Sequence, residues 1–220
     1  MKILLFGATG TVGRGVLSQC LKAPDVEQVL AVTRRTTGLV HDKLSELHHA
    51  DFRDYTEIAD RFAGYDACFW CLGRASRDLD ETAYTQVTYE FPVAAAQAMA
   101  AVAPGMAFFY VSALGADAHT QDETRRTKGL AEEAILRLFP DTGCVVRPAH
   151  VQPMDASAAR GYSLGYRLAV RLYPVLNRTL PRYVTTAEDM GRAMLDATRD
   201  HVPHRVMQGL DLRPASIPAD

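Results

Sequence analysis

Three glycines near the start of the chain, Gly7, Gly10 and Gly13, have a spacing that suits phosphate binding. They follow an apolar run at residues 2–6, which is typical of a strand buried on both faces. Apolar residues at helical spacing come after the last glycine. Because glycine allows a tight turn and a helix N-terminus offers free N–H groups, this segment predicts a site for the pyrophosphate of a dinucleotide. The turn residues expected to contact it are Gly7, Thr9, Gly10, Thr11, Val12 and Gly13.

Two arginines, Arg34 and Arg35, follow the second apolar run at residues 26–33, about 20 residues after the glycine turn. At this position in dinucleotide folds, an acidic residue binds the ribose of NAD, and an arginine accommodates the 2′-phosphate of NADP. The chain has no acid there, and guanidinium groups bind phosphate through paired hydrogen bonds. We therefore expect NADP rather than NAD. The alternative is that the two arginines form a solvated basic loop.

Strand-like and helix-like segments alternate as far as about residue 148. Besides the helix after Gly13, the expected strands cover 2–6, 26–33, 44–50, 65–72, 106–112 and 142–147, and the expected helices cover 56–62, 80–102 and 128–139. This alternation predicts an α/β fold with a Rossmann-type, doubly wound parallel sheet. Pro92 lies inside the 80–102 segment and is expected to kink or interrupt that helix.

The ends of two later strands carry further candidate cofactor contacts. Asp51 and Phe52 follow the strand at 44–50, where a side chain could reach the amino group of an adenine. The strand at 65–72 ends in Cys71 and Leu72 and is followed by Gly73, where the absence of a side chain would let the backbone pass close to the ribose and phosphates. We expect all five residues to contribute to cofactor binding.

The last third of the chain departs from the regular alternation. Residues 162–180 have a helical pattern rich in Arg and Tyr. Their apolar and aromatic side chains are most simply assigned to the core, with a partner subunit or a membrane surface as the alternatives. Thr185 and Thr186 are expected to cap a helix at 187–199, and 204–209 indicate one short strand.

We expect these C-terminal pieces to lie over the carboxyl ends of the strands, where this kind of fold binds ligands. Residues 150–220 would then form a small helical annex that faces the substrate or a partner. A length of 220 residues fits one domain with such an annex. We therefore expect residues 1–220 to form a single NAD(P)-binding Rossmann domain.

Composition restricts the remaining classes of function. A formal net charge of -2 provides no basic field, so we expect no nucleic-acid partner. No apolar run reaches the ~18 residues that a membrane span requires, and no signal peptide is recognisable, so we expect a cytoplasmic location. Cys68 and Cys71 form a C-x-x-C, but in a predicted strand they point to opposite faces, which indicates buried structural cysteines. His41, His48 and His49 lack ligand spacing, and we expect no metal site.

Later segments match a known pattern: residues 71–73, 111–115, 128–129 and 147–148, together with the glycine turn and the arginine pair. In these segments the chain resembles the short-chain dehydrogenase/reductase superfamily, in its extended or atypical branch. It most resembles the small NAD(P)-binding proteins related to the NmrA-like regulators and to the Tat-interacting oxidoreductase-like proteins. The likeness covers nearly the whole chain.

This resemblance implies a catalytic site. In typical members, a Ser at the end of the fifth strand polarises a substrate carbonyl, and a Tyr-x-x-x-Lys on the next helix supplies a proton and binds the nicotinamide ribose. Ser112 and Lys128 match the Ser and the Lys, but Thr124 stands where the Tyr is expected. A threonine hydroxyl is a far weaker acid than a phenol, whose pKa is about 10. The nearby groups that could substitute are Tyr84, Tyr110 and His119.

Three functions fit these residues. The first is an NADP-dependent oxidoreductase for a small carbonyl or alcohol substrate, with the usual tyrosine replaced by Thr124. The second is a non-catalytic NADP(H)-binding redox sensor or regulator that binds a protein partner. The third is an enzyme of the nucleotide-sugar epimerase or dehydratase kind, which the missing tyrosine and the short C-terminal region disfavour. The expected partner is a small-molecule substrate or a regulatory protein, and the sequence is compatible with a homodimer.

Overall fold

The computed structural model describes residues 1–75, 78–154 and 164–213. Seven parallel strands form its central sheet, in the order β3-β2-β1-β4-β5-β6-β9. The strands are β1 (Lys2–Phe6), β2 (Gln28–Thr33), β3 (Leu44–His48), β4 (Ala67–Trp70), β5 (Ala107–Val111), β6 (Gly143–Arg147) and β9 (Val206–Gln208). Each strand expected from the sequence is present, with the same or slightly shorter bounds. The predicted α/β fold with a Rossmann-type, doubly wound sheet is confirmed.

The first strand, β1, lies in the middle of the sheet. Leu4 pairs with Leu30 of β2 on one side and with Cys68 of β4 on the other. Residues 3–6 are fully buried, because helices cover both faces of the sheet. The strand order reverses at β1, and in doubly wound sheets the ligand site lies at the carboxyl ends of the strands beside such a reversal. The glycine turn, which leaves the carboxyl end of β1, is therefore at the position where this fold binds ligands.

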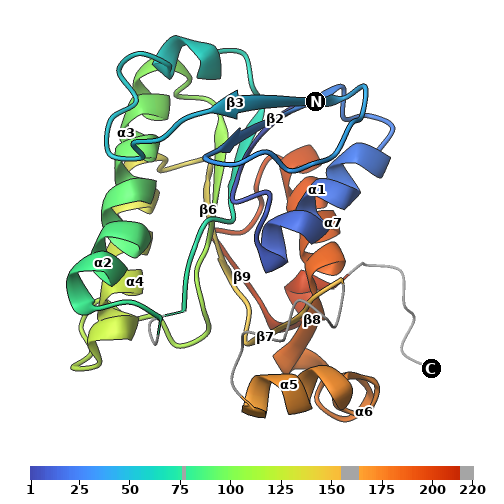
Figure 1. The fold of residues 1–220 in the computed structure, drawn as a ribbon. Coiled ribbons are helices and arrows are strands. Elements are labelled where there is room, and N and C mark those ends of the chain that lie inside the picture. The colour runs from blue at the N-terminus through green and yellow to red at the C-terminus, as the bar shows by residue number, and fades with distance from the viewer. Residues whose placement is uncertain (76–77, 155–163, 214–220) are drawn as a thin grey trace.

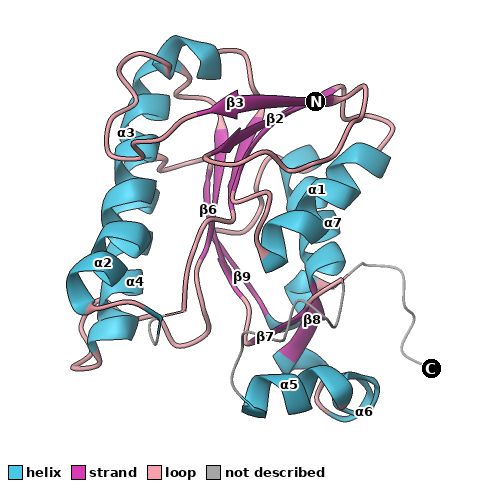
Figure 2. Cartoon of the chain, in the orientation of Figure 1, coloured by secondary structure: helices cyan, strands magenta, loops and turns pink. Residues whose placement is uncertain are grey.

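Helices cover both faces of the sheet (Figure 1 and Figure 2). On one face lie α1 (Thr11–Lys22) and α7 (Ala187–Arg199), and on the other α3 (Phe91–Val102) and α4 (Glu123–Leu138). The hydroxyl of Thr186 caps α7 by accepting a hydrogen bond from the Asp189 N–H at 2.9 Å, as expected. The expectation that this helix lies over the carboxyl ends of the strands is wrong. Its buried Ala and Met side chains pack on the sheet face beside α1.

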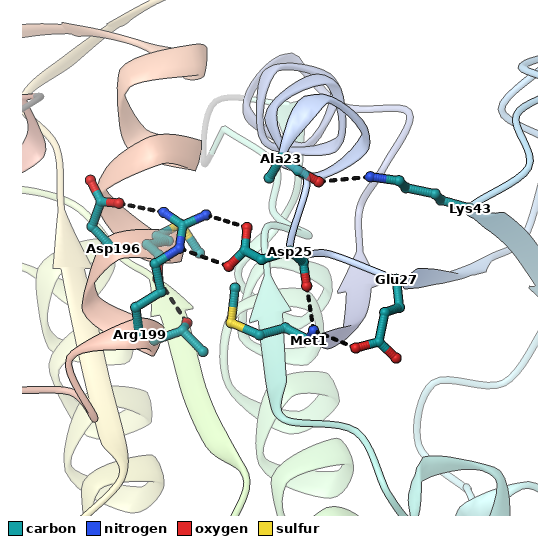
Figure 3. A network of polar contacts seen from close by, with 9 residues as sticks. Met1, Ala23, Asp25, Glu27, Lys43, Asp196 and Arg199 are labelled. Carbon is teal, nitrogen blue, oxygen red and sulfur yellow. Dashed lines mark hydrogen bonds and ion pairs between the residues drawn. The ribbon is translucent and has the colours of Figure 1, made fainter.

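Polar contacts near the amino end of β1 tie α7 to the chain that follows α1 (Figure 3). The Arg199 guanidinium donates to both carboxylate oxygens of Asp25, at 2.9 and 2.8 Å. The amino group of Met1 donates to the Asp25 carbonyl and, at 3.2 Å, to the Glu27 carboxylate. The Arg199 hydrogen bonds lower the pKa of Asp25. Because these groups are partly exposed, we expect them to orient the segments more than to stabilise them.

The expected helix at 80–102 is interrupted by one π-helical turn. Helix α2 (Glu81–Thr85) leads into a π turn (Gln86–Glu90) and then into α3. Pro92 has no N–H to donate to the carbonyl four residues earlier, which belongs to Thr88. The buried hydroxyl of Tyr110 donates to that carbonyl at 2.9 Å. The interruption expected near Pro92 is confirmed. Tyr110 of β5 donates to the Thr88 carbonyl the hydrogen bond that Pro92 cannot provide.

Two helices have bounds that differ from those expected. Helix α4 begins at Glu123, well before the expected start at residue 128, because the side chain of Asp122 caps it by accepting a hydrogen bond from the Arg125 N–H at 3.0 Å. The first turns of α4 are polar, so apolar periodicity does not reveal them. The expected helix at 56–62 is a single 3-10 turn, Ala59–Phe62.

The C-terminal region contains a second, two-stranded parallel sheet that the sequence analysis did not predict. It consists of β7 (His150–Gln152) and β8 (Val184–Thr186). Between these strands, the expected helix at 162–180 is two helices, α5 (Leu164–Arg171) and α6 (Tyr173–Thr179). Pro174 explains the break, because it cannot donate to the carbonyl of Val170. Residues 162 and 163 lie outside the described residues.

Figure 1 shows α5, α6, β7 and β8 beyond the carboxyl ends of the main strands, as expected for the annex. Two 3-10 turns complete this region, Pro181–Tyr183 and Gly209–Leu212. The hydroxyl of Thr185 donates to the Leu212 carbonyl at 2.9 Å and so connects β8 to the second of these turns. Of the predicted annex, residues 155–163 and 214–220 lie outside the described part of the chain.

Candidate functional site

The glycine turn joins the end of β1 to the start of α1 in very close packing. Gly7 has a φ of +79°, which favours glycine, and a Cβ there would lie 2.6 Å from backbone atoms of Cys71 and Leu72. A Cβ at Gly13 would lie 2.0 Å from the carbonyl oxygen of Gly7. Gly10 is the N-cap of α1 and provides no side-chain hydrogen bond, so the first N–H groups of the helix are not capped by that residue. The turn has the form of an anion-binding helix N-terminus.

Beside the turn, a cavity of about 180 Å³ brings several of the predicted cofactor residues together. These residues are Gly7, Thr9, Arg34, Arg35, Phe52 and Leu72. Arg34 places its guanidinium carbon 5.9 Å from the centre of the Phe52 ring, in a cation–π contact. Arg74 also lines the cavity and was missed by the sequence analysis, although its place directly after Gly73 was a usable signal. None of the described residues that line the cavity is acidic, so the cavity suits an anionic ligand.

Thr33 shapes the chain that carries the two arginines. Its hydroxyl donates to the Arg35 carbonyl at 2.6 Å and accepts from the Arg35 N–H at 3.2 Å. This local turn ends β2 and leaves the side chains of Arg34 and Arg35 exposed at the carboxyl edge of the sheet. Within the described part of the chain, no carboxylate pairs with either guanidinium. Both groups are therefore free to bind an anion without breaking an existing ion pair.

The other predicted cofactor contacts lie around this cavity rather than in its wall. Gly10, Thr11, Val12 and Gly13 form the turn and the first turn of α1, and Cys71 contacts the turn through its backbone. Asp51 forms an ion pair with Arg53 at 3.1 Å, and the hydrogen bonds from Arg53 lower the pKa of the Asp51 carboxyl. Gly73 has open space where a Cβ would be. In this state, Asp51 binds a neighbouring side chain instead of facing the cavity.

Ser112 is placed at the end of β5 with an unsatisfied hydroxyl. Its N–H donates to the Val146 carbonyl at 2.8 Å, which fixes the backbone between β5 and β6. The side-chain oxygen is buried and has no hydrogen-bond partner among the described residues. Leaving a buried hydroxyl unpaired costs about 1–3 kcal/mol. A ligand oxygen that bonded to Ser112 would remove this cost.

Lys128 lies one helical turn after Thr124 on α4, half-buried. Burial lowers the pKa of its ammonium group, and the Glu132 carboxylate partly opposes this effect. The next residue, Gly129, lets the loop after Ser112 pack against the helix, because a Cβ there would lie 2.1 Å from the backbone nitrogen of Ala118. The structure thus explains why a glycine follows Lys128: it allows the loop after β5 to pack on α4 beside the lysine.

Glu132 is a buried carboxylate that forms an ion pair with Arg147. The Arg147 Nε donates to the two carboxylate oxygens of Glu132 at 3.0 and 3.2 Å, and a second guanidinium nitrogen also bonds to it. The hydrogen bonds that Arg147 donates to Glu132 raise the pKa of Arg147. This pair connects the middle of α4 to the end of β6. It thereby fixes the helix that carries Lys128 against the carboxyl edge of the sheet.

The three candidates for the missing tyrosine have different environments. Tyr110 is buried among apolar residues, donates to the Thr88 carbonyl, and has its pKa raised by burial. His119 is exposed and lies 3.7 Å from Glu133. Tyr84 of α2 donates to the backbone carbonyl of Thr124 at 3.4 Å, and burial raises its pKa. Tyr84 is therefore the phenol placed next to the position where the tyrosine is expected.

Two further features bear on the expected chemistry. A larger cavity of about 630 Å³ lies on the other side of the turn, between α1 and the loop after β2, and is lined by Thr11, Arg14, Leu39 and Met154 among others.

The four cysteines are free. Cys68 packs in the layer with α3 and α4, whereas Cys71 packs towards α1. Burial raises the pKa of the Cys20 and Cys144 thiols to about 12 and that of Cys68 and Cys71 further still. The interpretation of Cys68 and Cys71 as structural is supported.

The fold and the glycine turn define a class of dinucleotide-binding protein, and sequence comparison agrees. Residues 7–137 match the family described as NAD(P)H-binding, and the chain belongs to this family. The matched region runs from the glycine turn through α4, so it includes the arginine cavity, Ser112 and Lys128. The expected relationship to the short-chain dehydrogenase/reductase superfamily is confirmed.

Two curated relatives are similar over most of the chain. Protein HTATIP2 of Rattus norvegicus is 25% identical over 148 residues, which cover 66% of this chain and 61% of the relative. Protein FMP52, mitochondrial, of Candida albicans is 26% identical over 151 residues, which cover 67% of this chain and 66% of the relative. The chain thus aligns with less than two thirds of the length of either relative.

Solved structures share the fold at low identity. A reductase described in a study of substrate inhibition in asymmetric catalysis superposes with a TM-score of 0.70 and 14% identity, covering 96% of this chain and 81% of that one. The WbmH enzyme of Bordetella bronchiseptica, in complex with NAD+, gives a TM-score of 0.66 and 17% identity, covering 93% and 73%. These likenesses establish the fold. Among the described residues, no helix is long and apolar enough to cross a membrane.

Proposed function

We propose that the protein binds NADP(H) and acts as an oxidoreductase on a small carbonyl or alcohol substrate. One observation carries the choice of NADP: Arg34, Arg35 and Arg74 line the cavity beside the glycine turn, and none of the described residues around it is acidic. A ribose-binding carboxylate, which would favour NAD, is absent from those residues. Three guanidinium groups provide the charge and the hydrogen-bond donors that a 2′-phosphate requires.

The residues of the site divide into roles. The N–H groups of the glycine turn would hold the pyrophosphate, and Arg34, Arg35 and Arg74 the 2′-phosphate. Lys128 would hold the nicotinamide ribose. A bound cofactor supplies or accepts a hydride. Ser112, whose hydroxyl is buried and unpaired in the described structure, would donate a hydrogen bond to the substrate oxygen and stabilise the charge that develops there.

The proton on the substrate oxygen needs its own donor, and Tyr84 is the candidate that the structure favours. Its hydroxyl lies at the backbone of Thr124, and both residues line a small cavity of about 170 Å³. Burial raises the pKa of Tyr84, so its phenol is protonated at neutral pH but is a weaker acid than a free tyrosine, and proton donation would require bound substrate and cofactor to lower that pKa. The usual arrangement, in which the lysine lies four residues after the tyrosine, is replaced here by a tyrosine from another helix.

A second function fits the same contact between Tyr84 and Thr124. If Tyr84 serves only to hold α2 against α4, the site retains cofactor contacts without a proton donor. The protein would then be a non-catalytic NADP(H)-binding sensor or regulator, and residues 150–220 would face a protein partner rather than a substrate. Cofactor binding would stabilise that surface without feeding a reaction.

Two measurements separate these functions. Titration calorimetry with NADPH and NADH tests the cofactor, and tighter binding of NADPH supports the proposal, whereas equal or reversed affinities contradict it. Turnover of a panel of ketones and aldehydes with NADPH then tests catalysis, with Tyr84→Phe as the variant. Activity that Tyr84→Phe abolishes supports the enzyme with Tyr84 as donor. Tight NADPH binding without turnover supports the sensor.

A further inference from the structure

Helices α5 and α6 lie at one end of the molecule (Figure 1), and several of the apolar side chains in and next to them are exposed. Leu168 and Leu172 lie one helical turn apart and are 55% and 44% exposed, and Val175 at the start of α6 is 59% exposed. Leu180 and Tyr183, which follow α6, are exposed to a similar degree. We call residues 164–183 the α5–α6 surface. These five side chains lie in water instead of in the core, which is unusual for so many in one short segment.

The exposed side chains are not the ones that hold these helices in place. Val170 is buried, and the hydroxyl of Tyr166 donates to the Val151 carbonyl at 2.7 Å. The rings of Tyr166 and His150 lie 4.9 Å apart. On α6, Asn177 accepts a hydrogen bond from the Arg213 guanidinium. These contacts thus anchor the helices through one face. The exposed apolar side chains on the opposite face make none of these contacts.

All charged residues in the sequence of the α5–α6 surface are positive. Residues 164–183 contain four arginines and no aspartate or glutamate. Arg171, Arg178 and Arg182 are exposed, and none of them forms an ion pair with a described residue. Elsewhere in the described fold, Arg147, Arg192 and Arg199 each pair with a carboxylate, whereas Arg34 and Arg35 beside the glycine turn do not. A net charge of -2 for the whole chain makes this concentration of positive charge a local feature.

We propose that the α5–α6 surface binds peripherally to an anionic lipid membrane, with Leu168, Leu172 and Val175 inserted among the acyl chains. Short amphipathic helices with aliphatic residues on one side and arginines at the flanks lie in the plane of the interface in this way. Several unpaired cations are satisfied together by a fluid anionic surface, because lipid headgroups can move to each of them. The two helices are too short to cross a bilayer and agree with the lack of a spanning helix among the described residues.

Vesicle flotation of the full chain tests the proposal. The probes are vesicles of phosphatidylcholine alone and vesicles that also contain phosphatidylglycerol. We expect binding only to the anionic vesicles, weakened by salt. Arg171→Gln/Arg178→Gln should weaken it about 25-fold, since each arginine contributes roughly fivefold. Leu168→Gln/Val175→Gln should weaken binding by on the order of tenfold, because it removes apolar area that would be buried among the acyl chains. Both side chains are exposed in the protein alone, so we expect the variant to fold.

Matched variants elsewhere control for charge and apolarity. Arg61→Gln/Arg137→Gln removes the same charge from exposed arginines outside the surface, and Val40→Gln/Leu130→Gln removes exposed aliphatic groups from other elements. Both controls should bind vesicles like the original chain. Equal effects of control and test variants would overturn the proposal, as would binding to neutral vesicles or to none. If light scattering shows a dimer that Leu168→Gln/Val175→Gln dissociates, and the chain binds no vesicles, the surface would belong to an interface with a second copy of the chain instead.

Discussion

Gly15 of α1 and Ala187 of α7 are in contact through their backbones: a Cβ at Gly15 would lie 2.3 Å from the Cβ of Ala187. The two helices come from opposite ends of the sequence, and this contact lets both reach the same face of the sheet. Gly15→Ala must push them apart. Overpacking costs about 1–3 kcal/mol, and the better helix propensity of alanine returns about 1 kcal/mol. We expect urea unfolding to show a net loss of up to about 2 kcal/mol.

Gly105→Ala is the control for that measurement, because a Cβ at Gly105 meets no atom within 4 Å. It should change the free energy of unfolding by less than about 0.5 kcal/mol. An increase in stability for Gly15→Ala would show that α7 moves away at no cost, and that the contact is not a constraint on the fold.

Arginine variants should separate the two cofactors. Arg34→Gln, Arg35→Gln and Arg74→Gln should each weaken NADPH binding by about tenfold, the loss of a charge-assisted hydrogen bond, and should leave NADH binding nearly unchanged. Arg53→Gln is the control, since Arg53 pairs with Asp51 outside the cavity. Calorimetry at two salt concentrations measures both effects. A similar loss for NADPH and NADH would place the arginines against the pyrophosphate or the adenine instead.

The central sheet was predictable because its strands are buried on both faces. Continuous apolar runs such as residues 2–6 and 28–33 are too short for a buried helix and are typical of strands inside a parallel sheet. The start of α4 was not predictable from apolar periodicity, because the side chains of its first turns are polar. The Asp122 cap was the signal available. Strands β7 and β8 have three residues each, too few to show alternation, and they pair across more than 30 intervening residues.

The cofactor part of the site was more predictable than the catalytic part. Gly7, Gly10 and Gly13 lie next to each other in sequence, and the arginines follow directly on a strand, so local order alone places them. The neighbourhood of Tyr84 and Thr124 depends on how α2 packs against α4, which no spacing in the sequence encodes. The unpaired hydroxyl of Ser112 is likewise visible only in three dimensions.

Lys128→Met should stabilise the protein without cofactor. Burial lowers the pKa of Lys128 below its ordinary 10.5, so the unfolded chain binds this proton more tightly than the folded one. Stability therefore rises with pH between the folded value and 10.5, and the charged lysine is unfavourable at all lower pH. We expect a gain of up to about 1 kcal/mol at pH 7, which shrinks as the pH approaches 10.

Urea unfolding across this pH range checks the prediction, with Lys2→Met, an exposed lysine, as the control. The same variant should bind NADPH more weakly, because Lys128 is the proposed ribose contact. Loss of stability in Lys128→Met would assign the side chain to the support of the fold. Unchanged NADPH affinity would remove it from the cofactor site.

Thr124→Tyr should raise carbonyl reductase activity. The variant places a phenol four residues before Lys128, where the ammonium group can stabilise its anion, and a positioned general acid contributes roughly a hundredfold in rate. Tyr84 already occupies part of the space near Thr124, so Thr124→Tyr is best measured both alone and with Tyr84→Phe. Thr127→Tyr adds the same ring to the same small cavity, one turn from Glu123, and should not raise the rate. Brisk reduction of many ketones by the unmodified chain, unaffected by Tyr84→Phe, would show that neither phenol is needed and that another group donates the proton.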